Sequence, residues 1–161
     1  MANEQNPFTT FNFSVQLTIP NGQSLGLSSP LCNSEFSEVD GLEMTMEPKT
    51  LREGGNNTRQ IHLVGPVSYA NLTLKRGMTA NQDLWKWFIA CTSGVRRGVK
   101  ASGVILMYDE AGTVGGNARV RYKLTDCLPT KIKAPSLNAK DGILAIEELQ
   151  IAYGSLAIEL A

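Results

Sequence analysis

Histidine is nearly absent from this chain of 161 residues, and that scarcity limits the chemistry available to it. His62 is the sole histidine, so a Ser-His-Asp triad, a Cys-His pair or a multi-histidine metal site would each depend on it. It stands between Ile61 and Leu63 at a solvent-facing position of an expected strand, which favours a surface role. We therefore expect no catalytic residue and no enzymatic activity.

Cysteine is also sparse, and its spacing excludes the usual frameworks. Cys32, Cys91 and Cys127 are odd in number and widely separated, so they form neither a paired disulfide set nor a C-x-x-C metal clip. They are best interpreted as small buried side chains in a reducing cytosol. The glycine-rich stretch 112–116 lacks the Lys-Ser/Thr of a phosphate-binding loop. The sequence thus predicts no metal and no cofactor.

Long apolar runs are missing as well. No segment approaches the roughly 18 consecutive apolar residues of a membrane span. The first residues, MANEQNPF, show neither the basic nor the apolar part of a signal peptide, so we expect no secretion through the general pathway. With 42% hydrophobic and 19% charged residues, the composition is typical of a globular protein. The length fits a single domain over residues 1–161.

Charge is balanced in total but unevenly distributed along the chain. Residues 1–47 contain six acidic and no basic residues, and residues 48–133 contain fourteen basic against five acidic ones. Residues 134–161 contain one lysine and four acidic residues. Such blocks allow copies of one chain to meet through complementary patches. The alternative is that folding interleaves the blocks and removes the asymmetry.

Strand patterns dominate the chain. Strict alternation of apolar and polar residues over 11–19 predicts a strand with one wet face, ending at the turn Pro20-Asn21-Gly22. Residues 23–35 have loop composition, and further extended stretches are expected at 36–46, 61–63, 67–77 and 120–124. The continuous apolar run 104–108 predicts a strand buried on both faces, followed by a hairpin loop over 109–117.

The pattern at the end of the chain fits two structures. Spacing of apolar residues over 143–160 suits either a helix or a strand, and the composition of the rest of the chain favours a strand. One helix is expected over residues 79–92, with Thr79 or Asn81 as its N-cap and Ser93-Gly94 at its end. Its expected apolar stripe is Leu84, Trp85, Phe88, Ile89 and Cys91.

Such a β-rich chain leaves strand edges to be covered. The strand over 11–19 has no inward lysine and no proline in its interior, the devices that normally protect an exposed edge. An open sheet of this kind pairs readily with another copy, which favours an assembling structural protein. The alternative from another class is a monomeric β-barrel that binds a small ligand.

Several motifs, in order and across nearly the whole chain, resemble those of the phage tail tube and contractile injection system inner tube proteins. The matching residues are Asn6-Pro7, Phe11-Asn12-Phe13, Phe36–Leu42, Leu51–Gly55, Asn71–Gly77, Leu84–Trp87 and Ile143–Leu149. The resemblance implies two packed antiparallel sheets in a small barrel-like sandwich with one flanking helix near 79–92. It also implies strand structure for the C-terminal segment.

The same resemblance implies a role. In this family six copies form a ring whose strands join in one closed barrel around a channel, and the rings stack into a tube. A contracting sheath drives that tube through the target membrane. The expected partners are therefore other copies of the chain, the sheath protein, baseplate and spike proteins, and tube-terminating proteins. The lumen would carry an effector or phage DNA. The protein would be synthesised and assembled in the bacterial cytoplasm, as part of a phage tail or an injection particle.

Interface residues follow from the same resemblance. The segment from Met44 to Ile61 corresponds to a long hairpin that reaches neighbouring subunits, and Gly54-Gly55 would let its tip bend at positive φ. The expected interface residues are Glu47, Leu51, Arg52, Glu53, Gly54, Gly55, Lys75 and Arg76. Ser14 and Gln16, polar positions of the first strand, are the candidates for the lumen surface.

Overall fold

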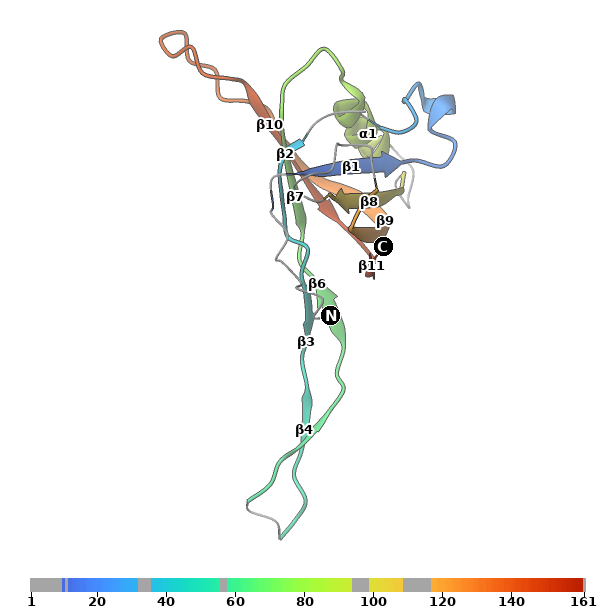
Figure 1. Ribbon diagram of the computed structural model, residues 1–161, viewed down its shortest axis with the longest axis vertical. Coiled ribbons are helices and arrows are strands. Elements are labelled where there is room, and N and C mark those ends of the chain that lie inside the picture. The colour runs from blue at the N-terminus through green and yellow to red at the C-terminus, as the bar shows by residue number, and fades with distance from the viewer. Residues whose placement is uncertain are drawn as a thin grey trace, which may run out of the picture.

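The computed structural model describes residues 10, 12–31, 36–55, 58–93, 99–108 and 117–160, and these are mainly β-strand with one α-helix. Figure 1 shows a packed body from which two hairpins project in different directions. The elements in chain order are β1 (Phe13–Thr18), a 3-10 helix (Gly22–Leu25), β2 (Phe36–Asp40), β3 (Met44–Met46), β4 (Lys49–Leu51), β5 (Ile61–Leu63), β6 (Val67–Tyr69), β7 (Leu72–Gly77), α1 (Asp83–Thr92), β8 (Ala101–Met107), β9 (Val120–Lys133), β10 (Ile146–Ala152) and β11 (Ser155–Leu160).

The body consists of two antiparallel sheets that share the 14-residue strand β9. Sheet A has the order β1-β8-β9-β11 and uses the first part of β9, residues 120–127. Sheet B has the order β9-β10-β7-β2 and uses residues 128–133 of the same strand. One continuous strand therefore connects the two layers and fixes how they are placed.

The chain bends sharply where the two sheets meet. Asp126 in β9 has a φ of 53°. Next to it, Gly154 lies in the short connection between the end of β10 and the start of β11. A Cβ atom at Gly154 would lie 3.1 Å from the Cβ of Asp126, so glycine permits this close approach. The Gly154 amide also donates to the Thr125 carbonyl at 2.8 Å. This bend brings the apolar faces of the two sheets toward each other.

Alternate strand positions supply the core between the sheets. The buried apolar residues come from both layers, from the segment before β2 and from α1: Val15, Leu17, Ile19, Leu27, Leu31, Phe36, Leu72, Leu74, Leu84, Trp87, Ala101, Ile105, Leu124, Cys127, Leu149, Ile151 and Tyr153. Helix α1 packs against β9, and the indole Nε1 of Trp87 donates to the Val99 carbonyl at 2.7 Å. The two-sheet sandwich with one flanking helix is confirmed.

Local predictions succeed where the two-residue period is long. In β1, Val15 and Leu17 are buried while Gln16 and Thr18 are exposed, as the alternation requires. Asn21 adopts a positive φ of 61° in the expected turn. The C-terminal segment is strand, divided into β10 and β11. Among the expected features, Phe11, Cys32, Gly94 and residues 109–116 lie outside the described residues.

Two predictions are wrong in detail. The run 104–108 is not buried on both faces: Ile105 is buried, but Val104 and Leu106 are half-buried, because none of the described elements forms a layer over that side of sheet A. The helix begins at Asp83, four residues later than expected, because Thr79 and Asn81 bond to the amides of Asn81 and Asp83 in the preceding loop.

The expected apolar stripe of the helix is also misplaced. Ile89 is exposed. The face toward the core is formed by Leu84, which the expected stripe included, and by Trp87, which it omitted. The segment 23–35, expected to be only a loop, adds Leu27 and Leu31 to the core. Isolated apolar residues in an irregular segment have no period, which is why the sequence did not mark them.

Candidate assembly surfaces

The feature of the structure that least resembles a self-contained protein is the long arm, residues 44–67. It is a narrow hairpin in which β3 pairs with β6 and β4 with β5. All residues of β3 and β4 and the last two residues of β5 are exposed, on both faces of the ribbon. A two-stranded ribbon with water on both sides is marginally stable by itself. The arm is therefore built to be covered by something else.

Glycines fix the course of the arm at its root. Gly41 has a φ of 98°, and a Cβ there would lie 2.1 Å from the carbonyl oxygen of Asn71. Further along, a Cβ on Gly65 would lie 1.7 Å from the carbonyl oxygen of Glu47. The two backbones approach more closely than any side chain allows at these points. Gly55 at the tip has a φ of 95°, which confirms the expected bend there.

Apolar side chains along the arm have no core to enter. The exposed large hydrophobic residues of the arm are Met44, Met46, Leu51, Leu63, Val64 and Val67. Val64 is 83% exposed. Full burial of one such side chain stabilises a protein by about 1.5–3 kcal/mol, so the arm carries stabilisation that the single protomer does not realise.

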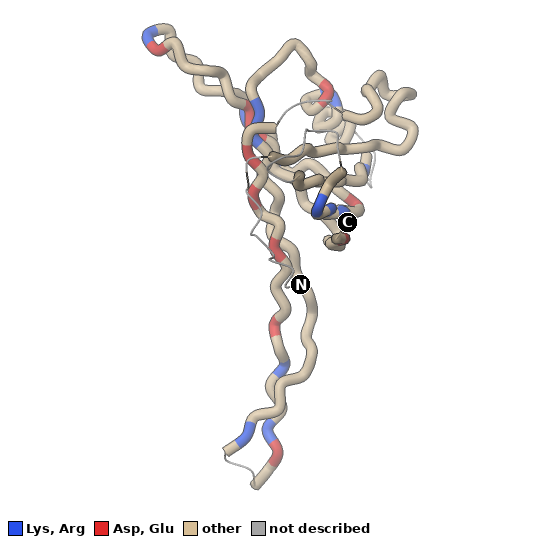
Figure 2. Tube along the Cα trace, viewed as in Figure 1, with Lys and Arg blue, Asp and Glu red and all other residues tan. Residues whose placement is uncertain are grey.

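Charged residues are sorted along the arm and its root (Figure 2). The acidic residues Glu43 and Glu47 lie on the limb of the hairpin that follows β2, Glu43 just before β3 and Glu47 between β3 and β4. The basic residues Lys49, Arg52 and Arg59 lie toward the tip, together with Glu53. This separation gives the arm a positive end, which attracts an acidic surface on another molecule.

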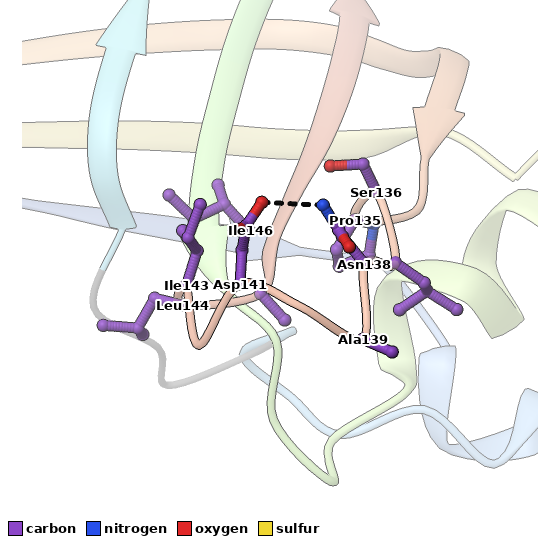
Figure 3. A pocket seen from close by; sticks show the side chains of 10 residues that line it. Pro135, Ser136, Asn138, Ala139, Asp141, Ile143, Leu144 and Ile146 are labelled. Carbon is purple, nitrogen blue, oxygen red and sulfur yellow. Dashed lines mark hydrogen bonds between the residues drawn. The ribbon is translucent and has the colours of Figure 1, made fainter.

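A second hairpin, residues 134–145, projects from the other end of sheet B between β9 and β10 (Figure 1). It exposes Leu137, Ile143 and Leu144, and Leu137 is 92% exposed. Its two limbs enclose a hollow of about 630 Å³, and at its turn the Asn138 amide donates to the Asp141 carboxylate at 2.6 Å (Figure 3).

That hollow lies on a projecting loop and is lined by residues 135–146, none of which belongs to the core between the sheets. Between the sheets, the space is occupied by the core side chains. The structure therefore gives no support to the alternative of a barrel that holds a small ligand inside.

Most of the expected interface residues lie together on the long arm. Glu47, Leu51, Arg52, Glu53 and Gly54 are exposed there, and so is Gly55 at the tip. His62 is exposed on β5 of the same arm. The two lumen candidates lie elsewhere, on β1 of sheet A.

Lys75 lies on the solvent-facing side of sheet B. Its Nζ is 2.9 Å from the Glu38 carboxylate on β2. The hydrogen bond that Lys75 donates to the Glu38 carboxylate, with the negative charges of Glu38, Glu148 and Asp40, raises the pKa of Lys75. The lysine therefore remains charged and belongs to a polar row across the sheet.

Arg76 is a correction to the expected interface. Its side chain is only 1% exposed, and its Nε donates to the Glu147 carboxylate inside the protomer. Its Nη2 donates to the Asn81 carbonyl at 2.8 Å, and the Trp85 indole donates to the same Glu147 carboxylate at 3.0 Å. The guanidinium thus joins β7, β10 and the start of α1 and is not available to another subunit.

Within the described part of the chain, no group of three or more His, Cys, Asp or Glu residues is arranged to hold a metal ion. None of the helices described there combines the length and apolar character that crossing a bilayer requires. What the described surface offers is a set of projecting hairpins and open strand edges.

Several solved structures are similar in fold to this chain. The chain is similar to a chain of an extracellular contractile injection system, the PVC sheath-tube complex in the extended state, with a TM-score of 0.77, 18% identity, and coverage of 98% of this chain and 95% of that one. It is also similar to a chain of the anti-feeding prophage baseplate, with a TM-score of 0.76, 23% identity, and coverage of 96% and 97%. Hcp1 from Salmonella typhimurium gives a TM-score of 0.52 at 13% identity, with coverage of 92% and 87%.

These likenesses concern the fold, because the sequence identities are low. Among curated proteins, no sequence matches the chain. The sequence model of the family described as T4-like virus tail tube protein gp19 matches residues 9–157, which is nearly the full length. The match includes both sheets, α1 and both projecting hairpins. This chain therefore belongs to the T4-like virus tail tube protein family.

Proposed function

We propose that this protein is the protomer of the inner tube of a contractile phage tail or injection system. Six copies form a ring, and the rings stack into a hollow tube. The observation that carries this proposal is the long arm, whose apolar side chains and backbone edges are exposed in the protomer. A head-to-tail contact that closes on rotation covers such edges in a ring and leaves the arms to bridge to the next ring.

The partners follow from this role. The similar solved structures include a sheath-tube complex, a baseplate and a tube-terminating cap. By analogy, we propose that the tube binds a contractile sheath, a baseplate with its spike, and a terminating protein. Its lumen conducts an effector or phage DNA, and the assembly as a whole pierces the target membrane. The protomer contributes binding surfaces and performs no catalysis.

On the arm, Glu47, Leu51, Arg52, Glu53 and the Gly54-Gly55 tip are the proposed contacts with neighbouring subunits. Their exposure and the positive charge near the tip support this assignment. Leu51 would enter an apolar surface, and Arg52 and Glu53 would form ion pairs at its rim.

Electron microscopy of the purified protein, alone and with sheath and baseplate proteins, tests the proposal. We expect rings or tubes with a central channel, and we expect R52E and the double variant G54V/G55V to remain folded but to form no tubes. The matched control is Lys86→Glu, which reverses one exposed charge on α1. A wild-type protein that stays a single small particle at every concentration and with every partner would refute the role.

A further inference from the structure

The long arm joins the body at a place where the strand pairing is interrupted. The pairing of β2 with β7 ends at Asp40 and Thr73, and the pairing of β3 with β6 begins further out. Between the two ladders, residues 41–43 and residues 70–71 belong to no strand. We call these two segments the joint. Figure 1 shows that both limbs of the arm continue from β2 and β7 of the body.

Backbone pairing alone holds the joint weakly. Across it, the Ala70 amide donates to the Glu43 carbonyl at 3.3 Å. A two-stranded ribbon is marginally stable by itself, and an interruption of its ladder leaves a place where it bends easily. An arm that must reach a fixed position on a neighbouring molecule therefore needs a further contact that holds the joint.

Tyr153 reaches the joint from the body. It follows the last residue of β10 and precedes Gly154 at the bend between the two sheets. In the pairing of β10 with β7, Ile151 stands opposite Leu72, so the chain two residues further on lies beside the joint. The Tyr153 side chain is only 7% exposed and belongs to the core between the sheets. The body thus fixes the position of this ring.

The hydroxyl of Tyr153 contacts the backbone of the first limb at three atoms. It donates to the Gly41 carbonyl at 2.8 Å and accepts a hydrogen bond from the Glu43 amide at 3.2 Å. The Glu43 carbonyl, also at 3.2 Å, is a second acceptor for the same proton. Because these contacts lie on both sides of Leu42, the first limb cannot swing at the joint without breaking them.

The ring of Tyr153 contacts the second limb. Tyr69 is the last residue of β6, and its ring centroid lies 5.4 Å from that of Tyr153, with the two planes tilted by 52°. This distance and tilt are typical of favourable aromatic pairs. One side chain of the body therefore contacts both limbs, the first through its hydroxyl and the second through its ring.

We propose that Tyr153 is the positioning residue of the long arm, and that its hydroxyl fixes the direction in which the arm leaves the body. This inference rests on the proposed tube function, in which each arm meets a neighbouring subunit at one place. A loosely held arm loses more conformational freedom when it docks, which weakens association. By holding the arm in one direction beforehand, Tyr153 lowers the protein concentration at which copies assemble.

Tyr153→Phe removes the hydroxyl and keeps the ring. The body should remain folded, because the backbone groups that the hydroxyl contacts have other partners as well. The Gly41 carbonyl also accepts from the Glu43 amide at 3.0 Å, and the Glu43 carbonyl also accepts from the Ala70 amide. What the variant should lose is the fixed direction of the arm.

Double electron–electron resonance on the protomer measures that direction. Spin labels are placed at Met46, exposed on β3, and at Lys86, exposed on α1. They are attached through unnatural amino acids, so that the native cysteines stay unmodified. The wild type should give one narrow distribution of distances, and Y153F should give a broad one. Sedimentation velocity should show that Y153F needs about tenfold more protein to assemble, the effect of losing one hydrogen bond.

Tyr108→Phe is the matched control. Tyr108 is also buried, and its hydroxyl lies 3.1 Å from the Ser14 hydroxyl of β1, within the body. This variant loses the same atom and shows whatever loss of stability the removal of a buried hydroxyl causes. Because Tyr108 has no contact with the joint, the distance distribution and the assembly concentration should match those of the wild type.

The outcomes separate the positioning role from the tube function. Distance distributions of equal width in the wild type and Y153F, or the same broadening in Y108F, would overturn the role of Tyr153. Assembly of Y153F at the wild-type concentration would overturn the link between arm direction and assembly, while the tube function stands. A wild type that forms no ring, even with sheath and baseplate proteins, would overturn the tube function, whereas the distances in the protomer still decide whether Tyr153 holds the arm.

Discussion

The body and the long arm use the same two-residue period for different purposes. In β7 the alternating residues Leu72 and Leu74 are buried beneath the facing sheet. In β3 the alternating residues Met44 and Met46 are exposed, although they are just as apolar. An apolar pattern therefore marks a surface that becomes buried, but it does not say within which molecule. The comparison separates residues that fold the protomer from residues that assemble it.

Polar residues divide in the same way. In the body, Arg76 and Glu147 are buried and hydrogen-bonded to each other and to neighbouring groups. On the arm, Arg52 and Arg59 are exposed. Changes in the body should thus lower the free energy of unfolding, and changes in the arm should weaken assembly alone.

Removal of the arm should produce the largest effect. If residues 49–63 are replaced by a short Gly-Ser link, assembly should be lost completely, because the outer part of the hairpin, with Leu51, Leu63 and its basic residues, is gone. The melting temperature should stay within a few degrees of the wild type, about the shift that 1 kcal/mol produces in a domain of this size. Sedimentation velocity and circular dichroism measure the two quantities. Normal tubes from the shortened chain would break the comparison.

Loss of the buried guanidinium should produce the next largest effect, on folding. Arg76→Met leaves the Glu147 carboxylate buried without its cation, which costs about 3–5 kcal/mol of unfolding free energy. Lys75→Met, one residue earlier and on the solvent-facing side of β7, should cost far less than the Arg76 change, because exposed ion pairs contribute little to stability. Urea unfolding at low protein concentration compares them. Equal losses in the two variants would mean that burial does not distinguish these positions.

Two glycines of the same region should respond differently to alanine. At Gly41, where φ is 98° and a Cβ would lie 2.1 Å from the Asn71 carbonyl oxygen, Gly→Ala should destabilise the root of the arm by about 1–3 kcal/mol. At Gly54 a Cβ would meet nothing within 4 Å, so Gly→Ala should leave stability unchanged. Thermal unfolding of both variants decides the matter, and similar melting temperatures would argue against a rigid root.

The smallest effect concerns an exposed ion pair of sheet A. The hydrogen bond from Lys123, with the charges of Lys123 and Arg121, lowers the pKa of Glu159. The pair therefore contributes stability above the ordinary glutamate value of 4.5, and loses it as the pH falls through the lowered pKa of the folded state. Glu159→Gln should remove this small pH dependence and leave assembly intact. Unfolding curves between pH 3 and 6 measure it.

Much of the body was predictable because its strands are long and regular. The period in residues 11–19 and 143–160 places Val15, Leu17, Leu149 and Ile151 on inward faces, and the structure agrees. The two-residue period of β7 also indicated the buried ion pair that the sequence analysis missed, because it places Arg76 on the same inward face as Leu72 and Leu74. Opposite charges at inward positions of two strands indicate a buried pair.

Other features were beyond reach of the sequence. The pairing of β7 with β10 is a contact between residues about 70 positions apart, and no local pattern specifies it. The strand register also places charged residues of alternating sign side by side across sheet B, in the order Glu38, Lys75, Glu148 and Lys133. This order is visible only in the folded sheet. The glycine tip of the arm was predictable because a positive φ is a local requirement.

Hydrogen exchange of the protomer and of the assembled form tests the division between body and arm most directly. We predict that backbone amides of residues 44–67 and 134–145 exchange rapidly in the protomer and become protected on assembly. Amides of β7, β9 and β10 inside the body should be protected in both states. Arm amides that are already protected in the protomer, or that exchange equally fast after assembly, would contradict the account.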